Sequence, residues 1–203
     1  AEIIEHKDFI GGRYSIFSEV GIFPTELMGL KIKKFKNIKK FLKNKSFVNS
    51  LIKNVASIYT LQSKKNNSVI LNYDSDLNDL GYWYQQLVAE SLGKNGKGIT
   101  PTLSFMPKDN HSMLQLYLDG PMNKFYTFLS TNNMDTPNKS YKNIVVKNIK
   151  FLKNKNLKSV LNAQKQATMN IFKSKKIPFR QINFREKNEK TLGEIFTFFV
   201  LET

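Results

Sequence analysis

The sequence predicts a three-layer α/β/α sandwich in which helices cover both faces of a mostly parallel, Rossmann-like sheet. Three observations lead to this fold class. Short apolar runs typical of buried strands alternate with amphipathic helical segments along the chain. The 203 residues can bury one sizeable core, and a hydrophobic content of 40% is ordinary for a folded protein. No repeat or low-complexity linker divides the chain, so we expect one domain over residues 1–203.

Each expected element rests on a local pattern. Apolar residues recur at helical spacing in three segments, and a fourth segment follows the same spacing until Gly93, a typical helix stop. Compact apolar runs flanked by polar residues indicate strands. The expected helices are 47–58, 80–91, 157–172 and 192–201, and the expected strands are 68–73, 125–129 and 177–184.

The chain carries a formal net charge of +16, which raises the question of a nucleic-acid or membrane partner. Only Arg13, Arg180 and Arg185 among its 32 basic residues are arginines, which argues against base-specific readout. The densest basic segment, Lys31–Lys45, also repeats apolar residues at helical spacing. We expect an amphipathic helix packed on the core with a solvated lysine face, and the same for Lys147–Lys158.

Composition excludes several classes of site. The sequence has no cysteine and only two histidines, so it offers no disulfide, no thiolate metal site and no histidine-rich metal centre. It has no apolar run of eighteen residues and no recognisable secretory signal. We expect a cytoplasmic protein that binds neither membrane nor nucleic acid.

A first candidate cluster is the turn around Gly11, Gly12 and Arg13. Two glycines let the backbone turn tightly and approach a ligand, and they present the only arginine in the first 179 residues. The third glycine of a dinucleotide fingerprint is missing. The alternative is an ordinary turn whose arginine pairs with a carboxylate.

A second cluster lies on the expected helix 80–91. Gln86 and Glu90 are four residues apart and therefore share one helix face. An amide and a carboxylate in this arrangement can hold a polyhydroxylated ligand and take a proton from it. The alternative is an exposed glutamate on a surface helix.

A third cluster surrounds His111, which lies among polar residues near an expected helix start. This setting favours a catalytic or hydrogen-bonding role as much as a structural one. His6 lacks such company and is expected at the surface.

These clusters, in this order, resemble the glucose-6-phosphate isomerase (phosphoglucose isomerase) family of the shorter bacterial type. The matching stretches are 11–15 with 20–22, 83–94 with 96–101, 109–115 with 118–121, and 193–203. The resemblance implies a sugar-isomerase (SIS) domain that acts on sugar phosphates. It assigns Glu90 as the base of a cis-enediol mechanism, Arg13 as the cation at the enediol oxygen, and Gly12 and Gln86 as substrate contacts.

The resemblance also implies a homodimer in which His111 is supplied across the interface to help open the sugar ring. It implies neither a metal nor an organic cofactor. The family's phosphate-binding loop and a catalytic lysine are not found in this sequence. We therefore expect the second SIS domain of a longer enzyme, without its N-terminal domain and C-terminal tail, and little activity from residues 1–203 alone.

Three other functions remain open from the residues. The domain could isomerise mannose 6-phosphate or an amino-sugar phosphate, or it could bind a sugar phosphate without catalysis. A basic nucleic-acid-binding module is the third, and it would require steeply salt-dependent binding through Lys31–Lys45.

Overall fold

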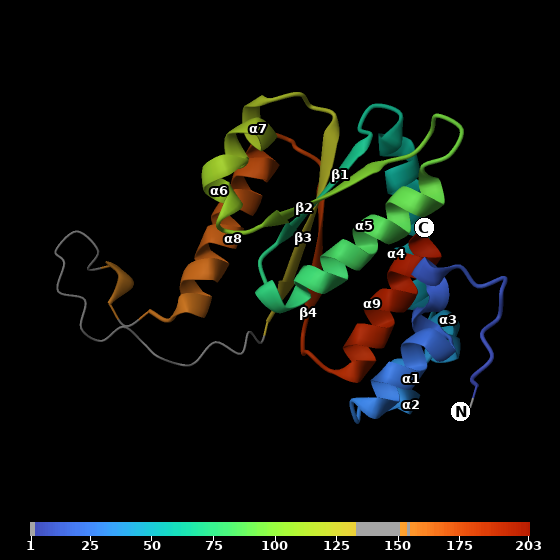
Figure 1. The fold of residues 1–203 in the computed structure, drawn as a ribbon. Helices are drawn as coiled ribbons and strands as arrows, with labels where there is room; N and C mark the ends of the chain where they lie inside the picture. The colour runs from blue at the N-terminus through green and yellow to red at the C-terminus, as the bar shows by residue number, and fades with distance from the viewer. Residues whose placement is uncertain (1–2, 133–150, 154) are drawn as a thin grey trace.

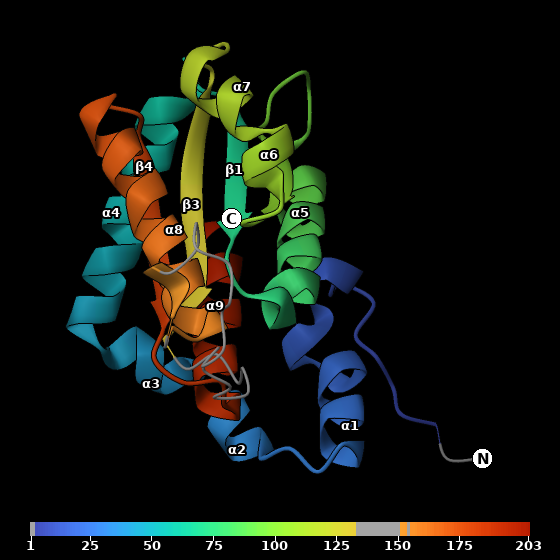
Figure 2. The ribbon, with the colours of Figure 1, turned by 90° about the vertical axis from the view of Figure 1, so that its left-hand side faces the viewer.

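The computed structural model describes residues 3–132, 151–153 and 155–203. Within these residues four strands form one parallel sheet in the order β2-β1-β3-β4. The predicted fold class is confirmed, since helices cover both faces of this sheet (Figures 1 and 2). The strands are β1 (Asn67–Asn72), β2 (Thr100–Phe105), β3 (Lys124–Thr131) and β4 (Phe179–Phe184).

The helices divide between the two faces and an N-terminal group. α4 (Lys45–Gln62), α5 (Asn78–Leu92) and α9 (Glu189–Glu202) lie on one face. α6 (Asp109–Ser112), α7 (Leu114–Asp119) and α8 (Leu157–Ser174) lie on the other. The remaining short helices are η1 (Gly12–Phe17), α1 (Glu19–Leu27), α2 (Ile32–Phe35), α3 (Ile38–Lys43) and η2 (Ser75–Leu77).

The alternation of side chains along the central strands creates two cores. In β1, Ile70 points toward the α5–α9 face, whereas Val69 and Leu71 point toward α8. All three are almost fully buried. A strand buried on both faces has no polar alternation, which is why the continuous apolar run 68–73 predicted it correctly.

The seven elements predicted from apolar patterns are all present, with ends shifted by a few residues. β2 was not predicted. It is an outer strand of the described sheet, it contains Pro101, and only Ser104 of its residues is fully buried. An outer strand tolerates proline on its unpaired side, so neither its composition nor its burial resembles that of β1.

The prediction of one helix over Lys31–Lys45 was wrong, because the chain breaks at Lys36 and Asn37 between α2 and α3. The break lets Phe35 enter the core between Phe17 and Phe196, at ring distances of 5.3 and 5.9 Å. The eight lysines of the segment are exposed, as expected of a solvated face. The second basic stretch, 147–158, lies partly outside the described residues.

No helix among the described residues is long and apolar enough to cross a membrane.

Candidate active site

The first predicted cluster folds into η1, the short helix that follows Gly11. The backbone of Gly11 has φ −63° and Gly12 lies in the 3-10 helix, so neither needs the left-handed conformation that glycine alone adopts easily. A special backbone conformation therefore does not account for these two glycines. A Cβ on Gly12 would meet no atom within 4 Å. What the exposed Gly12 provides is open space beside Arg13.

Arg13 reaches from η1 to the last turn of α5. Its Nε donates to the Ser91 hydroxyl at 2.8 Å, and its Nη1 donates to Glu90 Oε2 at 3.3 Å. Its guanidinium also lies 5.0 Å from the centre of the Tyr14 ring. The Tyr14 hydroxyl bonds Ser91 Oγ at 2.6 Å, so Ser91 connects both η1 side chains to α5.

Glu90 and Gln86 share one face of α5, as their spacing predicted. Gln86 Nε2 donates to Glu90 Oε1 at 3.0 Å, while Arg13 holds the other carboxylate oxygen. Both oxygens are thus oriented, yet the Glu90 side chain keeps 51% of its exposure and Arg13 keeps 22%. A carboxylate that is fixed and still accessible, with a guanidinium beside it, can accept a proton and stabilise a nearby negative charge.

His111 lies in α6, at the opposite end of β2 from Thr100. The predicted helix start is confirmed: Asp109 begins α6, and its carboxylate accepts a hydrogen bond from the Phe105 amide at 2.7 Å. The imidazole is exposed and makes no hydrogen bond within the described residues. β2 has six residues, which at ~3.3 Å per residue span about 20 Å. Figure 1 accordingly shows α6 far from the C-terminal end of α5.

The structure therefore brings together Arg13, Gln86 and Glu90 and leaves His111 apart from them. Sequence reasoning missed Ser91 and Tyr14 as the residues that position Arg13. Ser91 falls on the apolar stripe of the expected helix 80–91, directly after Glu90. A hydroxyl at such a position was the signal that could have identified it as a partner for Arg13.

His6 is exposed, as expected, and pairs with Glu19 at 3.3 Å. Glu19 opens α1, where the pKa of its carboxyl is lowered by its own backbone amide and by His6. Among the described residues, no three His, Cys, Asp or Glu side chains gather as metal ligands would.

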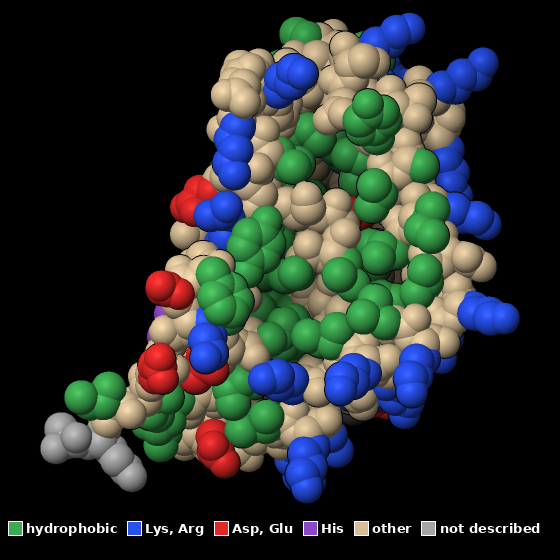
Figure 3. Space-filling model, turned by 90° about the vertical axis from the view of Figure 1, so that its right-hand side faces the viewer, with side chains coloured by type: hydrophobic (Ala, Val, Ile, Leu, Met, Phe, Trp, Pro, Cys, Tyr) green, Lys and Arg blue, Asp and Glu red, His purple; other side chains and the backbone are tan. Residues whose placement is uncertain are grey.

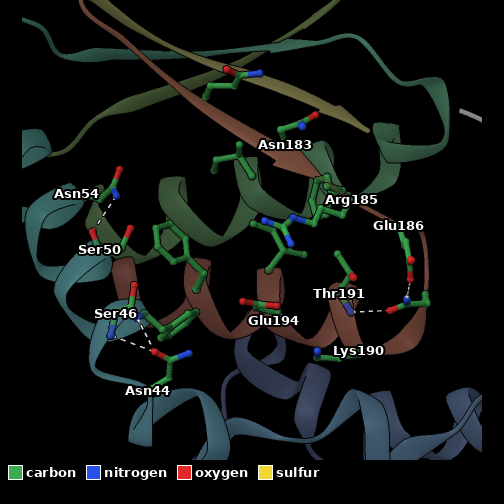
Figure 4. Close-up of a pocket in the computed structure, with 17 residues that line it drawn as sticks. Asn44, Ser46, Ser50, Asn54, Asn183, Arg185, Glu186, Lys190, Thr191 and Glu194 are labelled. Carbon is green, nitrogen blue, oxygen red and sulfur yellow. Dashed lines mark hydrogen bonds between the residues drawn. The ribbon is translucent and has the colours of Figure 1, made fainter. Parts of the chain in front are cut away.

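A separate cavity of about 720 Å³ lies between α4, β4 and α9 (Figure 4). Asn44, Asn54 and Asn183 line it together with Arg185 and Glu194. None of the five predicted site residues lines this cavity. Asn44 caps α4, Asn54 lies within α4 and Asn183 lies in β4, so no single sequence motif marked the cavity.

Comparison with known proteins gives a consistent result. A family model described as phosphoglucose isomerase matches residues 1–170. The chain is 34% identical to a probable glucose-6-phosphate isomerase of Methanococcus maripaludis, over 98% of this chain and 46% of that protein. It is 30% identical to the glucose-6-phosphate isomerase of Methanocaldococcus jannaschii, over 99% of this chain and 51% of that protein.

Solved structures agree in fold. A hypothetical protein from Thermus thermophilus superposes with a TM-score of 0.78 at 21% identity, over 95% of this chain and 48% of that one. A glucose-6-phosphate isomerase from Chlamydia trachomatis superposes with a TM-score of 0.72 at 15% identity, over 96% and 42%. The chain thus spans about half the length of the curated relatives it matches.

Proposed function

Because this chain belongs to the phosphoglucose isomerase family, we propose that it is one SIS domain of a longer aldose–ketose isomerase that interconverts glucose 6-phosphate and fructose 6-phosphate. The observation that carries the proposal is the position of the Arg13 guanidinium beside the Glu90 carboxylate, in a chain of this family.

In the proposed mechanism, the Glu90 carboxylate removes the proton from C2 of the open-chain aldose. The electron pair of the broken C–H bond forms the C1=C2 double bond of the enediol, and negative charge develops on the former carbonyl oxygen at C1. The guanidinium of Arg13 stabilises that charge. The C2 hydroxyl proton moves to the C1 oxygen, and Glu90 returns its proton to C1, which gives the ketose.

Supporting residues complete the site. Gln86 holds one oxygen of Glu90 and can turn its amide toward a substrate hydroxyl, while Gly12 leaves room for the sugar. His111 of the partner subunit opens the sugar ring in a homodimer. α6, which carries His111, lies far from the C-terminal end of α5, which carries Glu90 (Figure 1), and this separation supports the supply of His111 from a second subunit.

The proposed domain organisation predicts little turnover by residues 1–203 alone, since the chain spans only about half the length of its relatives. The test is a family-length protein that carries this sequence, assayed with fructose 6-phosphate, mannose 6-phosphate and glucosamine 6-phosphate. Preferred conversion of fructose 6-phosphate supports the proposal. Preference for another phosphosugar, or binding without turnover, would contradict it.

A further inference from the structure

α4 is an 18-residue helix with an apolar pattern, yet none of its residues is fully buried in the described structure. α5, α8 and α9 have similar lengths and each buries at least four residues. Helices gain most of their stability from packing an apolar face. α4 therefore obtains only part of this gain from its contacts within the described residues.

The apolar residues of α4 form two adjacent stripes. One contacts the core through Ile58 and Leu61, which pack against the cluster shared with α9. The other contains Ile52, Val55 and Tyr59, which share a face at spacings of three and four residues. These three side chains are exposed by 59%, 37% and 74%. We call them the α4 stripe.

α4 lies on a side of the molecule that carries a larger apolar surface. Figure 3 shows the side of the molecule on which η1, α1, α4 and the end of α9 lie, with hydrophobic side chains gathered over a hollow at its centre. Exposed apolar side chains on the neighbouring elements include Val20, Phe23 and Leu201. A contiguous apolar surface with a polar rim marks an interface with another protein segment.

Charge distinguishes the possible occupants of this surface. The chain carries a net charge of +16, and Figure 3 shows Lys and Arg side chains along the top, right and lower edges of this face, with acidic side chains at its left edge. α4 itself contributes Lys45 and Lys53. Two copies docked through this face would bring two strongly positive proteins together, and this repulsion disfavours a second copy. The curated relatives are about twice as long as this chain, so the family supplies a second segment of comparable size.

We propose that the α4 stripe is the docking surface for the other half of the longer isomerase, and that this half presents an apolar patch with acidic residues around it. The inference rests on the proposed domain organisation. It concerns a contact and not the reaction, so it can be tested without an activity assay.

The absence of cysteine in this chain permits a clean labelling experiment. Ile52→Cys and Tyr59→Cys place a thiol in the α4 stripe, and Ser57→Cys places one on the opposite side of the same helix. Each variant is prepared as residues 1–203 and as a chimaera in which this chain replaces the matching half of the Methanococcus maripaludis relative. Labelling by a thiol reagent is followed peptide by peptide in a mass spectrometer.

The proposal expects the stripe thiols to react about tenfold or more slowly in the chimaera than in residues 1–203, while Ser57→Cys reacts equally in both. Equal labelling of the stripe thiols in both proteins would overturn it. Protection within residues 1–203 that increases with protein concentration would also overturn it, because a second copy would then be the occupant. Inactivity of a chimaera that nevertheless protects the stripe would count against the proposed reaction alone.

Discussion

The guanidinium of Arg13 lies 3.3 Å from the carboxylate of Glu90, although 77 residues separate them in the sequence. Each group has a second partner, Ser91 for Arg13 and Gln86 for Glu90. When a ligand oxygen enters between the two charges, Ser91 and Gln86 therefore still hold Arg13 and Glu90 in place. Such pre-orientation lowers the reorganisation needed when charge develops in a transition state.

Replacing Arg13 tests the proposed charge stabilisation. Arg13→Met should lower kcat of the family-length enzyme by about 10²- to 10³-fold, because one preorganised donor to the developing oxyanion is lost. KM should change far less. Arg13→Lys keeps the charge but not the planar guanidinium, so its kcat should lie between those of the unmodified enzyme and Arg13→Met. Steady-state kinetics check this, and an unchanged kcat in Arg13→Met would exclude the role.

Ser91 is expected to act through Arg13. Ser91→Ala removes the acceptor for Arg13 Nε, a charge-assisted bond worth about 1.5 kcal/mol or more, and should lower kcat by roughly tenfold. Ser91→Thr retains the hydroxyl and should restore most of the rate. A loss of thermal stability without a change in kcat would show that Ser91 only holds η1 against α5.

The assignment of His111 to the partner subunit predicts complementation between two inactive proteins. An equal mixture of Glu90→Gln and His111→Ala dimers, after subunit exchange, should recover about a quarter of the wild-type activity, since half the dimers are mixed and each has one intact site. If the mixture shows no more activity than the two variants measured separately, His111 and Glu90 of one active site come from the same subunit.

Lys165 in α8 is buried, and its ammonium donates to Ser130 Oγ at 2.9 Å with no carboxylate partner among the described residues. Burial lowers the pKa of Lys165 below its usual 10.5. The unfolded state therefore binds more protons between the two pKa values, and this group's contribution to stability rises with pH there. At neutral pH the buried charge is a cost.

Lys165→Met should consequently raise the melting temperature at pH 7, and its advantage over wild type should shrink as the pH approaches 10.5. The difference between the two proteins is the quantity to follow, because burial raises the pKa of Tyr73, Tyr84, Tyr117 and Tyr126 and alkali destabilises both proteins. Lys173→Met, at an exposed position of α8, is the control. A pH-independent difference would show that Lys165 is not the titrating group.

Local patterns were enough to predict the interior of the fold. β1 and β3 are buried on both faces, so their apolar runs were continuous, and α5 combined an apolar stripe with a glycine stop. β2 and the break between α2 and α3 were not predictable in this way. Pro101 at the sheet edge and the insertion of Phe35 into the core both depend on tertiary position.

The site was predictable in part for the same reason. The contact between Gln86 and Glu90 follows from helical spacing alone. The contact between Arg13 and Glu90 joins segments far apart in the chain, and only the family resemblance placed both residues in one site. The roles of Ser91 and Tyr14 became apparent from the hydrogen bonds that hold Arg13.

The central claim, that Glu90 transfers a proton between C1 and C2, is tested most directly by following fructose 6-phosphate in D2O by NMR. The family-length protein that carries this sequence should produce glucose 6-phosphate with deuterium at C2. Glu90→Gln should reduce conversion by about 10²-fold or more while sugar-phosphate binding is retained. Undiminished deuterium incorporation by Glu90→Gln, or binding of the sugar without any turnover by the unmodified protein, would contradict the claim.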